Sequence, residues 1–187
     1  IGKAGHPEII GTAGQLPDGY PLRIISSKAE AEALDFSADK EIGMVTQTTL
    51  SVDDTAEITA YLQKRFPKLV AMKAGDICYA TTNRQKAVKA LAQKIDTIII
   101  IGSANSSNSR QLKETALKAG AAEALLIDDA GDLDWKKLEN CAKLGISAGA
   151  SAPEYLVEGL LDNLRRHYDK IKIHKLIIAE EKVSFKI

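Results

Sequence analysis

The stretch TIIIIGSANSSNSRQLKETALKAG, residues 97–120, decides the fold. It opens with four consecutive isoleucines, Ile98–Ile101, which are typical of a strand buried on both faces of a parallel sheet. A turn of small and hydroxyl-bearing residues follows, and a helical pattern then ends at Gly120, a residue type that commonly terminates helices. A strand, a turn and a helix in this order make one βα unit.

The same alternation extends in both directions along the 187-residue chain. Apolar, β-branched runs predict short strands at residues 22–26, 42–46, 68–72, 97–101, 124–127 and 143–147. Helical patterns predict helices at residues 53–66, 85–95, 107–119 and 153–164. We therefore predict an α/β fold of two small parallel-sheet lobes, residues 1–75 and 76–168, followed by a tail with a strand pair at 169–187.

The overall composition excludes several classes of function. Lysine plus arginine and aspartate plus glutamate both total 25, so a nucleic-acid-binding groove is not expected. No apolar run approaches the roughly 20 residues that cross a bilayer, so we expect no membrane-spanning segment. The two cysteines, Cys78 and Cys141, are too few for a disulfide framework and are typical of a reducing compartment.

Three predicted strand-to-helix turns, at residues 46–51, 102–109 and 147–154, consist largely of small and hydroxyl-bearing residues. Each leaves backbone N–H groups free at a helix start, where the helix dipole also favours an anion. Such turns gather at the carboxyl edge of a parallel sheet, so we expect all three at one edge. The uncharged donors there are Thr48, Thr49, Ser106, Ser107, Asn108 and Ser151. Alternatively, the turns are helix caps and nothing more, because serine, threonine and asparagine are preferred capping residues.

Patterns typical of helix caps occur at several of the predicted helix starts. In a capping box, a serine or threonine side chain accepts the backbone N–H three residues later. The side chain of that later residue accepts the backbone N–H of the serine or threonine in return. We expect such boxes, or weaker versions of them, at Ser51–Asp54, Thr82–Gln85 and Ser151–Glu154. Pro153 would then lie just inside its helix, where a missing N–H costs least.

Two further stretches carry residues with catalytic chemistry. His6 and Glu8 lie two apart in a glycine-rich segment, where an extended chain or a turn would face both toward one ligand. The Glu8 carboxyl could relay a proton and the His6 imidazole could hold a phosphate, although both residues also suit an ordinary surface turn. Cys78 lies just before a helix start, where the dipole would stabilise a thiolate. A lone cysteine is more often a small buried apolar residue, which is how we interpret Cys141.

Taken in order, the stretches at residues 5–8 with 11–15, 46–51, 76–85, 102–109 and 148–154 closely resemble the 4-hydroxy-3-methylbut-2-enyl diphosphate reductase family of the non-mevalonate isoprenoid pathway. The stretch DICYATTNRQ at 76–85 is nearly diagnostic by itself. The resemblance implies a three-lobed α/β enzyme closed around a 4Fe–4S iron–sulfur cluster. It also implies reductive removal of the allylic hydroxyl of the substrate, which yields isopentenyl and dimethylallyl diphosphates.

By the same resemblance, Glu8 looks like the proton donor and Cys78 like a ligand of the cluster. The residues expected to hold the substrate and its diphosphate are His6, Thr48 or Thr49, Ser106, Ser107, Asn108 and Ser151. Electrons would come from a ferredoxin- or flavodoxin-like donor, and the enzyme would be cytoplasmic, or stromal in a plastid if it comes from a plant or alga. The family's other two cysteines lie in an N-terminal lobe that this chain is expected to lack. We therefore expect the chain alone to be inactive and free of cluster.

Two other interpretations stay open. The chain could be a non-catalytic module that binds diphosphate without the cluster, and its binding would then be insensitive to Cys78→Ser. It could also be a sugar- or nucleotide-binding α/β domain, because a fold does not determine a function. No GxGxxG or Walker pattern supports that last interpretation.

Overall fold

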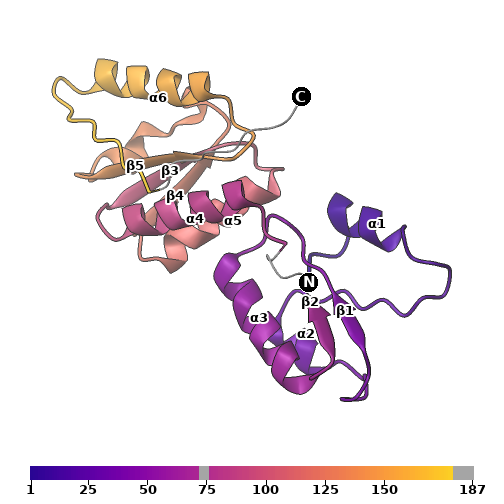
Figure 1. Cartoon of the computed structure of the whole chain (residues 1–187). Helices are drawn as coiled ribbons and strands as arrows, with labels where there is room; N and C mark the ends of the chain where they lie inside the picture. Colours follow the sequence, from indigo (N-terminus) through magenta and orange to yellow (C-terminus); the bar gives the residue numbers. More distant parts are fainter. Residues whose placement is uncertain (72–75, 179–187) are drawn as a thin grey trace. The chain divides into compact units, whose positions relative to one another are not determined.

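The computed structural model describes residues 1–71 and 76–178. Contacts between residues divide the chain into two compact units, Ile1–Cys78 (unit 1) and Tyr79–Ile187 (unit 2). Each unit contains its own parallel sheet accompanied by helices (Figure 1). The predicted α/β class with two small parallel sheets is confirmed, while the predicted lobe boundaries stay predictions.

Unit 1 is built on a two-stranded parallel sheet of β1 (Ile42–Met44) and β2 (Leu69–Ala71). Its helices are α1 (Pro7–Ala13), α2 (Lys28–Glu32) and α3 (Val52–Arg65). The apolar side of α3 packs on α2 and on the strands, and the buried residues of this core are Ile25, Ala31, Ile58, Leu62 and Phe66. The turn that follows β1 is thereby positioned between the sheet and the start of α3.

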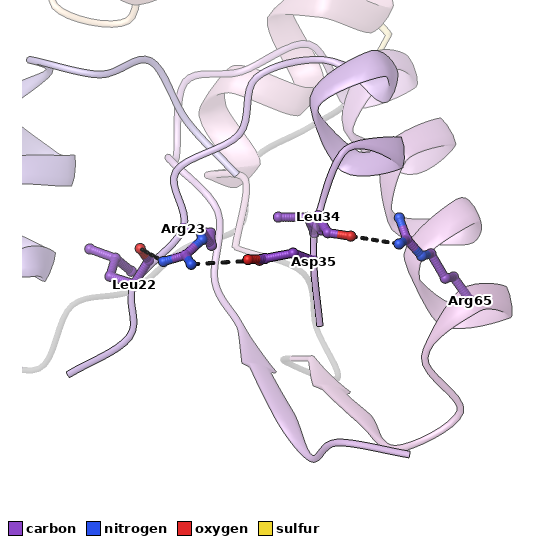
Figure 2. Close-up of polar contacts among 5 residues, drawn as sticks. All are labelled: Leu22, Arg23, Leu34, Asp35 and Arg65. Carbon is purple, nitrogen blue, oxygen red and sulfur yellow. Dashed lines mark hydrogen bonds and ion pairs between the residues drawn. The ribbon is translucent and has the colours of Figure 1, made fainter. Parts of the chain in front are cut away.

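Arg65, the last residue of α3, connects this helix to the segment around α2. Its guanidinium donates to three backbone carbonyls, those of Ala31, Glu32 and Leu34, at 2.9, 2.7 and 2.6 Å. These bonds occupy carbonyls that the end of a short helix leaves without intrahelical partners. Figure 2 shows the bond to Leu34 and, separately, the ion pair between Arg23 and Asp35, which spans 3.5 Å.

Residues 22–26 do not form the predicted strand. The Ile25 carbonyl accepts a hydrogen bond from the Gly2 N–H at 2.8 Å, and the Ile1 carbonyl accepts one from the Gln47 N–H, also at 2.8 Å. The backbone of these first two residues therefore bonds to the 22–26 segment and to the chain after β1. One backbone bond does not make a ladder, so within the described part of the chain the apolar pattern of this segment has no strand partner.

Unit 2 is built on a three-stranded parallel sheet in the order β4-β3-β5. Its strands are β3 (Thr97–Ile101), β4 (Glu123–Ile127) and β5 (Leu144–Ala148). Its helices are α4 (Tyr79–Ala92), α5 (Ser107–Lys118) and α6 (Glu154–His167), with short 3₁₀ helices η1 (Ala130–Asp132) and η2 (Trp135–Leu138). The central strand β3 is confirmed residue for residue.

The four isoleucines of β3 are completely buried because helices cover both faces of the sheet. Ile98 and Ile100 pack with the apolar sides of α4 and α5, whereas Ile99 and Ile101 pack with α6 (Figure 1). Alternate residues of a strand point to opposite faces, which explains why a continuous apolar run was required here. The Ile101–Ile127 and Ile101–Ala148 pairings place the ends of the three strands at one edge.

One of the three predicted capping boxes forms its cap. The Ser51 hydroxyl accepts the backbone N–H three residues on, at 3.2 Å. The prediction at Thr82 is wrong because α4 already begins at Tyr79, and its polar first turns offer no apolar spacing that would mark the start. The prediction at Ser151 is wrong because Pro153, which has no side-chain acceptor, occupies the cap position of α6.

Residues 168–178 form no strand, so the predicted strand pair is absent from this part of the tail. Apolar side chains there, such as Ile173 and Ile177, are exposed, and no strand of the described residues pairs with them. The remainder of that prediction, at 179–187, and Met72 of the predicted 68–72 strand lie outside the described residues. Among the described helices, none is long and apolar enough to cross a membrane.

Candidate functional site

The first candidate site, in unit 1, begins at the N-terminus of α1. His6 is the N-cap, and its Nδ1 accepts the Glu8 backbone N–H at 3.2 Å. Pro7 follows at the first helical position, where its fixed backbone angle suits a helix. The prediction of an extended segment or turn is therefore wrong. The cap and the proline start a helix without the apolar spacing by which helices are recognised in a sequence.

Among the residues that the structure describes, Thr48 holds the Glu8 carboxyl group. Its Oε2 accepts the Thr48 backbone N–H at 2.7 Å, and its Oε1 accepts the Thr48 hydroxyl at 2.8 Å. Two hydrogen bonds from one residue to both oxygens of the carboxyl group fix its orientation. The two residues are 40 positions apart, and the fold brings them together by placing the turn after β1 beside α1.

Cys78 is connected to the same threonine. Its backbone N–H donates to the Thr48 carbonyl at 3.1 Å, and its thiol is exposed. As predicted, it lies directly before the start of α4. A second link joins the segments, since the Asp76 carboxylate accepts the Thr46 backbone N–H. Thr48 thus contacts Glu8 through its N–H and hydroxyl, and Cys78 through its carbonyl.

Gln47 supports this turn and was missed by the sequence analysis. Its side chain is 1% exposed, its Nε2 donates to the Thr49 hydroxyl at 2.9 Å, and its Oε1 accepts the Lys3 backbone N–H at 3.1 Å. It therefore joins the turn after β1 to the start of the chain. The sequence did offer one signal for Gln47, which is a glutamine among threonines directly after a predicted strand. An amide buried there needs hydrogen-bond partners for both its oxygen and its nitrogen.

The second candidate site, in unit 2, lies where β3 and β5 end side by side. The Ser106 hydroxyl caps α5 by accepting the Ser109 N–H at 3.3 Å. Asn108 is 6% exposed, and neither its Oδ1 nor its Nδ2 has a hydrogen-bond partner among the described residues. A buried polar group without a partner costs about 1–3 kcal/mol, so this amide favours a polar ligand at the helix start.

Two glycines allow the turns of unit 2 to approach the start of α5. Ser109 is completely buried, and a Cβ placed on Gly102 or Gly149 would lie 2.3 or 2.4 Å from its hydroxyl oxygen. Gly102 also has a φ of +153°, an angle that residues other than glycine rarely adopt. The Gly149 N–H donates to the Ile101 carbonyl at 2.8 Å, which fixes the second turn to β3. The close approach of Ser109 therefore favours glycine at both positions, in addition to the backbone angle at Gly102.

The predicted single anion-binding edge is divided between two sheets. The turns at 102–109 and 147–154 follow neighbouring strands of unit 2, but the turn at 46–51 follows β1 in the separate sheet of unit 1. The prediction of one common edge is wrong because a strand–turn–helix pattern does not specify which sheet its strand joins. Ser107 is partly buried in the first turn of α5, and Ser151 is exposed ahead of α6.

The described residues supply an incomplete set of metal ligands. Within 1–71 and 76–178, no group of three histidine, cysteine, aspartate or glutamate side chains could hold a metal ion. Cys141 packs against the core of unit 2, as predicted, which leaves the exposed thiol of Cys78. One thiol fits one ligand position of an iron–sulfur cluster, but the described part of the chain does not complete the site.

Comparisons with known proteins bear on these two sites. The model of a family described as LytB protein matches residues 1–165. Relatives named 4-hydroxy-3-methylbut-2-enyl diphosphate reductase include those of Gluconobacter oxydans and Phenylobacterium zucineum, which are 50% and 51% identical over 187 residues. These matches cover 100% of this chain and 55% and 59% of the relatives, so the chain spans little more than half their length.

A solved structure shares the fold. It is described as the E-1-hydroxy-2-methyl-but-2-enyl-4-diphosphate reductase from Plasmodium falciparum, and it aligns with a TM-score of 0.82 at 35% sequence identity. The alignment covers 88% of this chain and 51% of that one. The arrangement of strands and helices is therefore common to both chains.

Proposed function

The chain belongs to the LytB protein family, and on that premise we propose that it contributes to the active site of a 4-hydroxy-3-methylbut-2-enyl diphosphate reductase. The proposed reaction removes the allylic hydroxyl as water, consumes two electrons and two protons, and yields isopentenyl or dimethylallyl diphosphate. The observation that carries the proposal is the meeting of Glu8, Thr48 and Cys78 at one turn.

Glu8 and Thr48 would form a two-residue proton relay. The relay requires Glu8 in its protonated form, with its hydrogen bond to the Thr48 hydroxyl reversed so that Glu8 donates. Thr48 then receives the Glu8 proton while it passes its own to the departing hydroxyl, and Glu8 is left as a carboxylate. The Thr48 backbone N–H, which bonds the other carboxyl oxygen, keeps the acid oriented during this transfer. Protonation of the departing hydroxyl converts it into water, a much better leaving group.

Substrate binding would rely on hydroxyl, amide and imidazole side chains. In unit 2, the start of α5 and the turn before α6 would hold the diphosphate through Ser106, Ser107, Asn108 and Ser151. In unit 1, the contacts would come from His6, Thr48 and Thr49. The unpartnered Asn108 amide supports the first assignment, since an anion oxygen would accept the hydrogen bond that its Nδ2 does not make in this structure.

Cys78 would ligate one iron of a 4Fe–4S cluster whose other protein ligands lie outside the described residues. When bound, the cluster supplies the two electrons for cleavage of the C–O bond, which a ferredoxin- or flavodoxin-like protein would replenish. This chain's own contribution at that point is positional, because the bond from the Cys78 N–H to the Thr48 carbonyl joins the backbone of Cys78 to the turn that carries Thr48.

A chimera tests the relay directly. The part of the Gluconobacter oxydans reductase that this chain does not cover is joined to the chain, and the product is reconstituted anaerobically with iron and sulfide. Glu8→Gln and Thr48→Val should each lower kcat about 100-fold, the usual contribution of general acid catalysis. Thr48→Ser should retain most activity because it keeps the hydroxyl. The control is Thr59→Val, a partly exposed threonine of α3 that takes no part in these contacts. Equal turnover by Thr48→Val and Thr48→Ser would exclude the relay.

A further inference from the structure

Arg84 lies in α4, the helix that starts directly after Cys78 and packs against β5 (Figure 1). Its Nε donates to the carbonyl of Ala148 at 3.2 Å, and its Nη1 approaches the carbonyl of Ala80, in the same helix, at 3.5 Å. The first bond spans 64 positions of the sequence and ends on the last residue of β5. It therefore joins α4 to the beginning of the turn that carries Ser151.

The Ala148 carbonyl needs a partner from outside the sheet. Among the described residues β5 pairs with β3 alone, and the Gly149 N–H points toward β3, where it donates to the Ile101 carbonyl at 2.8 Å. Successive residues of a strand direct their backbone groups to opposite sides, so the Ala148 carbonyl faces away from β3. Arg84 supplies the donor that a further strand would otherwise supply.

The turn after β5 thus has two anchors, one on β3 through Gly149 and one on α4 through Ala148. Gly149 also packs against the Ser109 hydroxyl of α5, so the position of the turn determines how it meets the start of that helix. The unpartnered Asn108 amide lies at this helix start. Movement of the turn after β5 would therefore change the distance between the donors of this turn and the donors at the start of α5.

Arg84 bonds to the protein backbone at this edge. Its hydrogen-bond partners among the described residues are backbone carbonyls, and no ion pair between described residues includes it. Replacing it by methionine removes both a hydrogen bond and a charge. Replacing it by lysine keeps the charge but removes the planar guanidinium that reaches two carbonyls.

We propose that Arg84 is a positioning residue for anion binding in unit 2. It holds the Ala148–Ser151 turn against the start of α5, so that the two turns present their donors to one phosphate-bearing ligand. This inference rests on the diphosphate binding assigned to unit 2 in the proposed function. Arg84 acts through the Ala148 carbonyl and is not itself a ligand.

Calorimetric titration of the 187-residue chain with inorganic diphosphate tests the inference. Arg84→Met should raise Kd about tenfold or more, as expected when a charged hydrogen bond is lost. Arg84→Lys should raise Kd by about threefold or more, to a value between the parent and the methionine variant. The matched control is Lys86→Met, which removes a charge from an exposed position of the same helix and should leave Kd within about twofold.

Two further readouts separate positioning from a general loss of structure. Amide hydrogen exchange at Gly149 and Ala152 should accelerate in both Arg84 variants and not in Lys86→Met, because those N–H groups fix the turn. In the chimera, the same two variants should raise KM and leave kcat within about twofold, since Arg84 touches no reacting group. If Arg84→Met does not fold, as judged by circular dichroism, Arg84→Lys carries the test.

The outcomes distinguish this inference from the proposed function. An Arg84→Lys Kd equal to that of the parent would overturn the positioning role, because the charge alone would then suffice. Full affinity in Arg84→Met, with affinity lost in Asn108→Ala and Ser106→Ala, would overturn the role of Arg84 and leave the proposed function standing. A parent chain that does not bind inorganic diphosphate would overturn both this inference and the part assigned to unit 2.

Discussion

At the scale of single residues, Thr48 organises the candidate site of unit 1. Its N–H, hydroxyl and carbonyl each make a separate bond, two to Glu8 and one to Cys78. A change of its side chain leaves both backbone bonds in place, so the effect of Thr48→Val on turnover reports the hydroxyl alone. That separation makes this threonine a sharper probe than Glu8, whose replacement alters both bonds that its carboxylate accepts.

Gly149→Ala should lower the free energy of unfolding by about 1–3 kcal/mol, because its new Cβ would lie 2.4 Å from the Ser109 hydroxyl oxygen. Ser109→Ala alone should have little effect, since that hydroxyl has no hydrogen-bond partner among the described residues. The double variant should recover most of the loss, because the nearest remaining Ser109 atom would be its Cβ at 3.6 Å. Urea unfolding of the parent, the two single variants and the double variant measures this double-mutant cycle. If the two changes in the free energy of unfolding simply add, the contact between residues 149 and 109 is contradicted.

The sequence indicated which residue types carry chemistry, but not which of them meet. Hydroxyl-rich turns are recognisable because each follows an apolar run and opens a helix. The pairing of Glu8 with Thr48 was not predictable, since the two are 40 residues apart and no local rule relates them. Gln47 escaped notice for the same reason, because its importance comes from burial and from partners in another segment.

At the scale of secondary-structure elements, prediction succeeded where burial imposed a strong pattern. β3 needed apolar side chains on both faces, and its limits agree with the isoleucine run. The starts of α1 and α4 were not predicted, because a cap with a proline begins one and polar turns begin the other. The 22–26 segment has strand-like composition, but a strand also needs a neighbour, and composition does not reveal one.

The caps at Ser51 and Ser151 looked similar in the sequence and differ in the structure, which gives a matched pair of variants. Ser51→Ala should lower the stability of unit 1 by about 1 kcal/mol, because the cap of α3 is lost. Ser151→Ala should change stability by less than about 0.5 kcal/mol, because this exposed serine makes no capping bond. Thermal unfolding with amide exchange in α3 and α6 measures both, and equal losses would refute the assignment of the caps.

At the scale of the whole molecule, the two units carry different parts of the proposed chemistry. Unit 1 contains Glu8 and Thr48 of the proposed proton relay and the exposed Cys78, while unit 2 contains the unpartnered Asn108 amide and the other donors proposed for an anion. Equal numbers of acidic and basic residues are consistent with an anion site built from local geometry and not from overall charge. The chain spans little more than half the length of the relatives cited, and its described residues offer one exposed thiol where a cluster needs several ligands.

The central claim is that this chain holds reductase residues that act only when the rest of the site is present. Its most direct test is turnover of 4-hydroxy-3-methylbut-2-enyl diphosphate with a chemical reductant, measured on three anaerobically reconstituted samples. These are the chain alone, the chimera with the Gluconobacter oxydans remainder, and that chimera carrying Cys78→Ser. We predict product from the chimera and none above background from the chain alone or from Cys78→Ser. Turnover by the chain alone, or full activity in Cys78→Ser, would contradict the claim.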